Sequence, residues 1–298
     1  MFGRRHDGRR VKNIDPIVQI TPYLMPMRCD AQVFLQHKID WEAMTRYIAA
    51  QQAKGERLTH MQIIIACYVR AISQNPQINR FVMNKQYFAR NNCSVSFTIL
   101  KDPQVAESGE TTVKLSFDLT DTLYDVRDRF NLGVEAARDE KTDNFVDSLV
   151  RVLFKIPGLA TTVAAIVRLL DRYGIAPNVL IDELPFYSSM FITNNASIGL
   201  HHVNHHIYNW GNVGLFFGMG LVEKIAVVEN GETRMKRFLP IGITADERIC
   251  GGAFYARFFA DVVRYLNHPE LLEVPPESVV FDEGIEYHVP KPGKPSES

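Results

Sequence analysis

The stretch "ADERICGGAFYARF" at residues 245–258 marks the point where an apolar strand is predicted to run into the last helix of the chain. Three charged residues, Asp246, Glu247 and Arg248, stand in a row beside the glycine pair Gly251-Gly252. Charged groups between two apolar elements need a partner or a function, because an isolated charge is costly to bury. The stretch is therefore a turn between two elements and a candidate functional site.

Strands and a helix are predicted around this stretch. The segments 188–196, 213–228 and 233–244 are rich in β-branched and aromatic residues and are read as strands, and the last two are joined by a hairpin turn at 229–231. The closing helix is expected from about Gly252 to Asn267. Its apolar stripe is formed by Phe254, Phe258, Val262 and Tyr265.

The N-terminal half is also predicted to contain both strands and helices. Strands are predicted at 16–25 and 30–39, at 79–90 with a turn in the middle, at 93–100 and at 112–118, with the polar segment 101–110 as a loop. Asp40 is expected to cap a helix over about 41–54, and Thr59 one that ends near Asn75. A further helix follows Thr120. The pattern predicts one mixed α/β domain.

Composition narrows the class of protein. The 298 residues are 46% hydrophobic and 22% charged, which is typical of a soluble globular chain, and the net charge of -1 gives no support for a nucleic-acid partner. Residues 1–12 are basic and are expected to form a solvated arm. The cysteines show no CxxC pair or disulfide framework, and no secretory signal is expected, so a cytoplasmic location is predicted. These cysteines are Cys29, Cys67, Cys93 and Cys250.

Residues 149–170 are apolar enough to raise the question of a membrane span. Three cations, Arg151, Lys155 and Arg168, lie within this segment, and each would cost about 2.5–3.5 kcal/mol near a bilayer centre. Pro157-Gly158 also divides the segment. Two short amphipathic helices facing the core or a partner are predicted, with membrane contact as the weaker alternative.

The C-terminal half resembles a known family. The segments "FITNNASIG" at 191–199 and 220–272 are similar to the catalytic domain of the dihydrolipoamide acyltransferases of 2-oxo acid dehydrogenase complexes, relatives of chloramphenicol acetyltransferase. A weaker likeness extends to residue 11, and 144–186 is read as a helical insertion. The resemblance implies a two-layer α/β sandwich, coenzyme A as substrate, and homotrimers with active sites between subunits. Counterparts of the family's lipoyl and subunit-binding domains are not expected.

The family signature reads Asp-His-Arg-x-x-Asp-Gly, in which the histidine takes a proton from the thiol of coenzyme A or dihydrolipoamide. In this frame Asp246, Arg248 and Gly252 fit, while Glu247 replaces the histidine and Gly251 the second acid. The resemblance also places Thr193 at the hydroxyl that stabilises the oxyanion. Substrate-binding residues expected beside these groups are Asn194, Asn195, Arg248 and Gly252, with Asp246 and Gly251 as structural parts of the motif.

A glutamate is a weak substitute for the histidine. A free Glu lies about 4 pKa units below a thiol, which makes the proton transfer uphill by about 5–6 kcal/mol. Burial could raise the pKa of Glu247 by up to about 3–5 units, whereas Arg248 would oppose this shift. Glu247 as base and Glu247 as a structural or salt-bridging residue therefore both remain open.

The segment "LHHVNHHIYNWG" at 200–211 offers another base. On a helix, His201 with His205 and His202 with His206 would share a face, as metal ligands do, but the trailing glycine and tryptophan favour a loop. No metal is expected. His201 or His205 is the alternative base, against four histidines that only pack or face solvent.

Two functions are compatible with the sequence. One is a stand-alone acyltransferase that uses coenzyme A, with residues 13–273 as the catalytic domain and 274–298 as a flexible tail. The other is a catalytically inactive pseudoenzyme that serves as a trimeric scaffold or binding module. The insertion 144–186 is a candidate surface for a protein partner.

Overall fold

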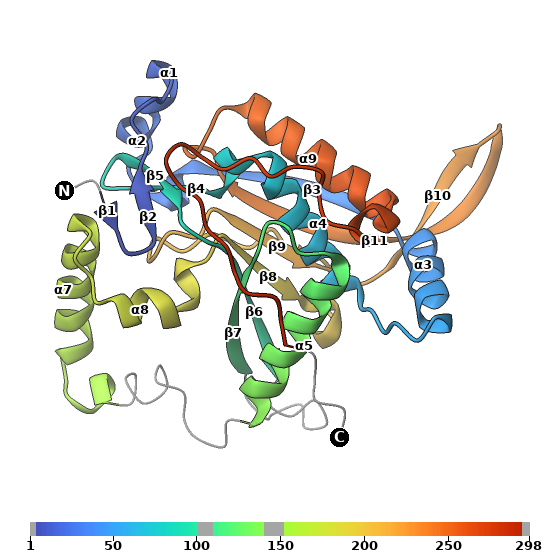
Figure 1. The fold of residues 1–298 in the computed structure, drawn as a ribbon, viewed down its shortest axis with the longest axis horizontal. Helices are drawn as coiled ribbons and strands as arrows, with labels where there is room; N and C mark the ends of the chain where they lie inside the picture. Colours follow the sequence, from blue (N-terminus) through green and yellow to red (C-terminus); the bar gives the residue numbers. More distant parts are fainter. Residues whose placement is uncertain (1–3, 101–109, 140–151, 294–298) are drawn as a thin grey trace.

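The computed structural model describes residues 4–100, 110–139 and 152–293. A large mixed sheet forms one layer, with strand order β10-β11-β9-β8-β6-β7 and with β3 paired to β11, and helices cover one of its faces (Figure 1). A smaller sheet, β1-β2-β5-β4, lies at one end. The predicted two-layer α/β sandwich is confirmed, since one large mixed sheet packs against one layer of helices.

The elements have the following bounds. The strands are β1 Arg4–Arg5, β2 Gly8–Arg10, β3 Gln32–Asp40, β4 Arg80–Met83, β5 Gln86–Arg90, β6 Cys93–Leu100, β7 Glu110–Phe117, β8 Met190–Asn194, β9 Leu215–Met219, β10 Glu223–Glu229 and β11 Glu232–Asp246. The main helices are α1 Pro16–Gln19, α2 Thr21–Leu24, α3 Trp41–Ala53, α4 His60–Gln74, α5 Leu123–Asp139, α7 Leu159–Tyr173, α8 Asn178–Glu183 and α9 Gly252–Asn267.

The core lies between the large sheet and the helix layer. Alternate residues of β11, such as Ile241 and Ile243, belong to this core, whereas Gly242 and Thr244 face away from the helices. Helix α4 is the central helix, because it is buried over most of its length and contacts both α5 and α9. The large sheet therefore presents a second face that the helices leave uncovered.

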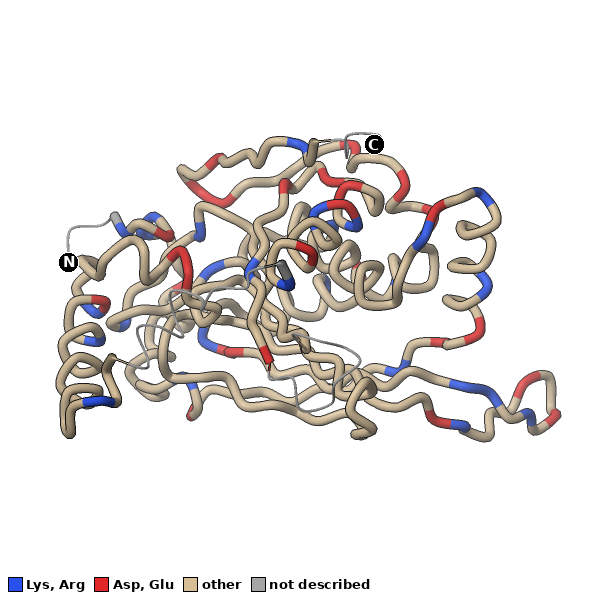
Figure 2. Tube along the Cα trace, turned by 90° about the horizontal axis from the view of Figure 1, so that it is seen from below, with Lys and Arg blue, Asp and Glu red and all other residues tan. Residues whose placement is uncertain are grey.

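Most predicted elements are confirmed. Asp40 caps α3 by accepting a hydrogen bond of 2.8 Å from the Ala43 amide, and Thr59 forms a capping box at the start of α4. Helix α9 has the predicted bounds. The β10–β11 hairpin turns at Asn230-Gly231, both with positive φ, and Figure 2 shows that the hairpin carries both acidic and basic residues and projects from the body.

The strand predicted at 16–25 is wrong. This segment forms the short helices α1 and α2, because the Asp15 side chain accepts a hydrogen bond from the Ile17 amide and a proline stands in the first turn of each helix. The strand predicted at 213–228 is interrupted at residues 220–222 and forms β9 and β10. Local capping at 16–25 overrides the β-branched composition.

The prediction that residues 1–12 form a solvated arm is wrong for Arg5 and for the strand β2, while Arg9, Arg10 and Lys12 are exposed as expected. β2 pairs with β5, and Arg5 is only 7% exposed. The Arg5 guanidinium donates hydrogen bonds to Asp7 at 2.8 Å and to Asp171 at 2.5 Å and lies 5.4 Å from the ring centre of Phe81. Arg5 therefore has acidic and aromatic partners within the fold.

The insertion is described from residue 152 onward. Residues 152–155 are helical, Pro157-Gly158 interrupts the chain, and α7 follows, so two amphipathic pieces are observed as predicted. Helices α7 and α8 lie beside β1 and β2 at one end of the molecule (Figure 1). None of the described helices is long and apolar enough to cross a membrane. Residues 101–109 of the predicted loop, and 144–151 of the insertion, lie outside the described residues.

The C-terminal segment 274–293 contains no helix or strand but is attached to the body. The Val280 amide donates to the Ser73 carbonyl oxygen at 2.8 Å, and Arg80 pairs with Asp282. The Val289 amide donates to the Asp118 carboxylate at 2.8 Å. The segment that the sequence suggested as a loose tail therefore follows the surface of the helix layer.

We expect this attachment to weaken in acid. Burial alone would raise the pKa of Asp118, but hydrogen bonds from Thr120 and Val289 keep it below its ordinary value. A lowered pKa adds stability above the unfolded-state value of about 3.9, and this stability is lost as the pH falls through the lower folded-state value. Hydrogen exchange should show lost protection of the Val289 amide in this range. Asp118→Ala should remove that protection at every pH, whereas the exposed control Glu286→Ala should not; equal protection in both variants would contradict the assignment.

Candidate functional site

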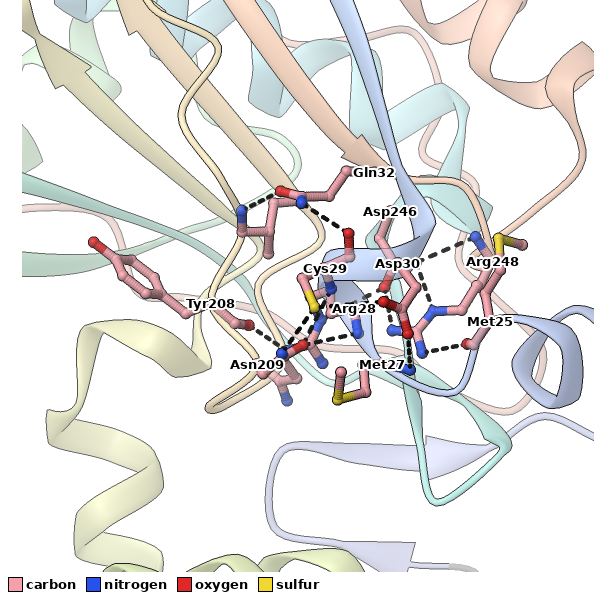
Figure 3. A network of polar contacts seen from close by, with 12 residues as sticks. Met25, Met27, Arg28, Cys29, Asp30, Gln32, Tyr208, Asn209, Asp246 and Arg248 are labelled. Carbon is pink, nitrogen blue, oxygen red and sulfur yellow. Dashed lines mark hydrogen bonds and ion pairs between the residues drawn. The ribbon is translucent and has the colours of Figure 1, made fainter.

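Asp246 and Arg248 form a buried ion pair at the end of β11 (Figure 3). Nε and Nη2 of Arg248 each donate a hydrogen bond of 2.8 Å to the Asp246 carboxylate. Arg28 approaches the same carboxylate, with its Nε 3.5 Å from Asp246 Oδ2. Burial alone would lower the pKa of Arg248, but the hydrogen bonds and charge of Asp246 raise it. These contacts make Arg248 a structural partner of Asp246, and its role in substrate binding stays a prediction.

Glu247 takes no part in this ion pair. Its amide donates to the Ala31 carbonyl oxygen at 2.9 Å, while its side chain is exposed. No hydrogen bond or ion pair holds its carboxylate within the described part of the chain. The salt bridge to Arg248 considered in the sequence analysis is absent, because Asp246 occupies the guanidinium. Glu247 is thus a free carboxylate next to a fixed one.

Glu247 lines a cavity of about 600 Å³. The other lining groups are mostly apolar and come from α1, α2, β3, the end of β11, the turn after it and α9, namely Ile17, Val18, Thr21, Val33, Leu35, Ala245, Cys250, Gly251, Gly252, Tyr255, Ala256 and Phe259. The motif glycines Gly251 and Gly252 stand at its wall, where an added Cβ would meet no atom within 4 Å. The motif turn therefore opens onto a cavity large enough for part of a substrate.

Cys250 and Tyr255 are further polar groups of this cavity that the sequence analysis did not select. Burial raises the pKa of the Cys250 thiol to about 12, so it is not a thiolate at neutral pH. Burial also raises the pKa of Tyr255, whose hydroxyl donates to the Asp246 carbonyl oxygen at 2.7 Å. Both groups remain protonated, which leaves Glu247 as the proton acceptor among the cavity's side chains.

Thr193 lies at the end of β8 on the sheet face that the helices leave uncovered. Its hydroxyl donates to Asn195 Oδ1 at 3.3 Å. Asn195 is 7% exposed, and its Nδ2 has no acceptor among the described residues. Asn194 is exposed, and its carbonyl oxygen accepts a 2.6 Å hydrogen bond from Ser197. The unpartnered Asn195 Nδ2 is a free donor, and the Thr193 hydroxyl becomes one when it rotates away from Asn195 Oδ1, so the two residues can supply the donors that an oxyanion site requires.

The histidine segment lies flat on the same face of the sheet, without helical structure. Glycines allow this close approach: a Cβ at Gly242 would lie 2.3 Å from the Val203 carbonyl oxygen, one at Gly218 2.6 Å from it, and one at Gly220 2.0 Å from the His202 amide nitrogen. The helical i,i+4 spacing of the histidines therefore does not occur. Within the described residues, no three His, Cys, Asp or Glu side chains are grouped so as to hold a metal ion.

His205 is the histidine held most closely on this face. Its ring stacks on Phe216 with centroids 4.1 Å apart, and its Nδ1 lies 2.7 Å from the His206 carbonyl oxygen. Burial lowers the pKa of His205, which favours the neutral ring. Because a carbonyl oxygen only accepts, Nδ1 carries the proton, and the lone pair is on Nε2. His205 is therefore a neutral base.

The remaining histidines of the segment are less well placed than His205 to act as a base near Thr193. His201 is exposed, with its Nδ1 3.5 Å from Glu223 Oε1. His202 Nδ1 lies 3.9 Å from the same oxygen, and His206 is exposed. His201 is thus directed to a carboxylate of β10 rather than to Thr193.

We expect Gly242→Ala to displace the histidine segment, because the new Cβ would collide with a backbone oxygen that cannot rotate away. Overpacking of this kind costs about 1–3 kcal/mol. Gly251→Ala is the matched control, since nothing lies within 4 Å of its Cβ position and its φ of -66° suits alanine. Chemical denaturation of both variants would measure the difference. Equal stability would show that the segment does not need this close contact.

Strand register separates Thr193 from Glu247 within one chain. Thr193 pairs with Gly218, which pairs with Gly242, so these three residues are level across the sheet. Glu247 follows Gly242 by five residues, a distance of about 17 Å along a strand. Phe216, under His205, is only two residues from Gly218, about 7 Å. One chain therefore brings Thr193, Asn195 and His205 to one region and leaves Glu247 at another.

The part of the chain that contains the candidate site matches a known protein family. Residues 187–274 match the family of 2-oxoacid dehydrogenases acyltransferase (catalytic domain). This match includes Thr193, the histidine segment and the 246–252 turn. A search of curated proteins found no match.

The chain is also similar to solved structures of acyltransferases. A probable dihydrolipoamide acetyltransferase from Listeria monocytogenes 4b F2365 has a TM-score of 0.55 and 12% identity, over 88% of this chain and 95% of that chain. The cubic core of a pyruvate dehydrogenase multienzyme complex has a TM-score of 0.49 and 14% identity, over 89% of this chain and 94% of that chain. A chloramphenicol acetyltransferase has a TM-score of 0.47 and 11% identity, over 79% of this chain and 88% of that chain. At such identities the first structure shows the fold, and the activity is a separate question.

Proposed function

We propose that the protein is a coenzyme A-dependent acyltransferase whose active sites form between the subunits of a homotrimer. The observation that carries this proposal is the free carboxylate of Glu247 on a cavity of about 600 Å³, with Thr193 too distant in the same chain to act with it. A neighbouring subunit would supply the missing half. The match of residues 187–274 to the acyltransferase catalytic domain supports this reading.

The cavity fits the thiol-bearing arm of coenzyme A better than its phosphates. An extended pantetheine arm is mostly apolar with two amides, and the lining is mostly apolar, with Thr21, Cys250 and Tyr255 as polar groups beside Glu247. Lys, Arg and His side chains are absent from the lining that the structure describes. The nucleotide end would therefore lie outside this cavity, with the thiol near Glu247.

The chemistry follows from two groups. The Glu247 carboxylate takes the proton of the acceptor thiol while its sulfur attacks the acyl thioester carbonyl. The hydroxyl of Thr193 from the neighbouring subunit donates a hydrogen bond to the oxyanion that develops. When the intermediate collapses, the C–S bond to coenzyme A breaks, and the leaving thiolate takes the proton from Glu247.

His205 is the second candidate for the base. Its ring stacks on Phe216, whose backbone lies about 8 Å from that of Thr193 on the same sheet face, and its Nε2 carries a lone pair. In this version the acyl group is held by Thr193 and Asn195 and the proton goes to His205 of the same chain. Glu247 would then serve only to shape the turn.

A pseudoenzyme is the second candidate function, and the exposure of Glu247 favours it. A glutamate matches a thiol as a base only when it is buried, and in the single chain it faces solvent. A trimer that binds an acyl thioester without turnover would then use the cavity as a recognition site.

Two measurements separate these functions. Calorimetry with coenzyme A and with acetyl-coenzyme A tests binding, and chromatographic detection of released coenzyme A in the presence of dihydrolipoamide tests turnover. We expect binding and release. Binding without release would favour the scaffold, and an absence of both would eliminate coenzyme A as ligand.

A further inference from the structure

A second cavity, of about 430 Å³, lies where α7 meets the N-terminal part of the fold. Its walls come from α7, the segment 26–28, the turn between β4 and β5, and the segment 209–211. Among its lining side chains as described, five are cationic, namely Arg28, Lys85, Arg168, Arg172 and Arg248, and Asp171 is the acidic one. It shares no lining residue with the Glu247 cavity.

The carboxylate of Asp171 does not neutralise this cavity. Arg5 Nη2 donates to Asp171 Oδ1 at 2.5 Å, and the Tyr187 hydroxyl donates to Oδ2 at 2.9 Å. Arg5 itself lies outside the lining. Arg248 is likewise satisfied by Asp246. Arg28 shares the Asp246 carboxylate with Arg248, with its Nε 3.5 Å from Oδ2, so one carboxylate serves two of the five cations.

Three of these cations are positioned by neutral groups. Lys85 Nζ lies 4.4 Å from the ring centre of Tyr23, and Arg168 Cζ lies 5.2 Å from that of Trp210. Arg172 Nε donates to the Asn84 side-chain oxygen at 2.9 Å. In the described portions of the chain, none of the three lies within 4 Å of a carboxylate oxygen. Their positive charge is held in place without a counter-ion.

The buried end of the cavity has unsatisfied donors. Arg28 is 5% exposed and donates from Nη1 to the Tyr208 carbonyl oxygen at 2.8 Å, while its Nε has no hydrogen-bond acceptor. Nε1 of Trp210 also lacks an acceptor among the described residues. Burial lowers the pKa of Arg28, and the charge of Asp246 offsets this effect only in part. An anion nearby would stabilise this cation.

We propose that this cavity binds a phosphate-bearing anion between Arg28, Lys85, Arg168 and Arg172. Several guanidinium groups around one space suit a phosphoryl group, which carries more than one negative charge and accepts paired N–H donors. A single carboxylate would neutralise one cation and leave the others unpaired. The site depends on α7, which belongs to the insertion, and it does not rest on the proposed acyl transfer.

Two sources of phosphate fit the surroundings. One is a soluble compound with a diphosphate group, for which the volume is sufficient. The other is the headgroup of an anionic phospholipid. Helix α7 carries three exposed apolar side chains, Ile166, Leu169 and Tyr173, on the same short helix as Arg168 and Arg172, and these could contact a lipid surface.

The test uses the full chain and calorimetric titration with inorganic pyrophosphate. We expect Arg168→Glu/Arg172→Glu to weaken binding at least about tenfold, because two attractive charges become repulsive. Lys54→Glu/Lys224→Glu is the matched control: it changes the net charge equally at two exposed positions outside the cavity, and its binding should stay within about twofold of wild type. Far-UV circular dichroism would verify that both variants are folded.

Flotation with phosphatidylcholine vesicles, with and without phosphatidic acid, identifies the source. Binding of pyrophosphate alone assigns a soluble ligand, and binding only to phosphatidic acid vesicles assigns a lipid headgroup, with the same loss in Arg168→Glu/Arg172→Glu. The proposal is overturned if wild type binds neither probe, or if both double variants lose binding equally. An intact acyl-transfer activity in Arg168→Glu/Arg172→Glu would separate this site from the proposed active site.

Discussion

Asp246→Asn is expected to lower the free energy of unfolding by about 3–5 kcal/mol. The Asp246 carboxylate accepts two hydrogen bonds from Arg248 and is approached by Arg28, and these three residues are at most 5% exposed. An asparagine keeps the shape but removes the negative charge, which leaves two guanidinium cations together in the interior. Urea or guanidinium denaturation, analysed as a two-state transition, would measure the loss.

An exposed ion pair provides the control for this prediction. Glu232 pairs with Arg234 at 3.0 Å on the β10–β11 hairpin, with side chains 71% and 63% exposed. Glu232→Gln should change stability by less than about 0.5 kcal/mol, since such pairs are screened by solvent. Similar effects of the two substitutions would mean that Asp246 is not the electrostatic centre of the turn.

Helices α3, α4 and α9 could be predicted because their signals are local. Asp40 and Thr59 each satisfy an amide three residues ahead, and Asn230-Gly231 adopts the left-handed conformations that a two-residue hairpin requires. Helix α9 begins directly after the glycine pair and has the predicted bounds. Each of these signals is contained in a few neighbouring residues, so the rest of the fold does not alter it.

The N-terminal arm could not be predicted for the opposite reason. Arg5 hydrogen-bonds Asp171, 166 residues away in the sequence, so nothing near Arg5 indicates its partner. The same holds for the anion cavity, whose cations come from segments far apart. In 16–25, β-branched residues suggested a strand, while a side-chain cap and two prolines determined the outcome.

The sequence predicted which residues belong to the candidate site better than it predicted how those residues are arranged. The motif frame indicated that Asp246, Glu247 and Arg248 matter, but only the structure assigns Arg248 to Asp246 and leaves Glu247 free. The glycines Gly218 and Gly242 had no evident function in the sequence. They allow the backbone around Val203 to lie against the sheet, which places His205 on the face of Thr193.

Glu247→Gln is expected to reduce acyl transfer by about 10²- to 10⁴-fold, the usual contribution of a general base. The amide keeps the shape of the side chain and cannot accept the thiol proton. Thr193→Val should cost about 10²- to 10³-fold through the lost oxyanion hydrogen bond. Initial rates with acetyl-coenzyme A and dihydrolipoamide would measure both. If His205 is the base, Glu247→Gln stays active and His205→Ala is inactive instead.

Mixed trimers of these two inactive variants test whether the site lies between subunits. A contact is intact when one subunit supplies Thr193 and its neighbour supplies Glu247, so one chain must carry Glu247→Gln and the other Thr193→Val in the right order. With equal amounts co-expressed and mixed at random, about one quarter of the contacts meet this condition, and about one quarter of wild-type activity should return. The control is the double variant Thr193→Val/Glu247→Gln co-expressed with either single variant, which can form no intact contact. If both groups act within one chain, every chain in the mixture is defective and no activity returns, because no assembly can reunite Thr193 with Glu247.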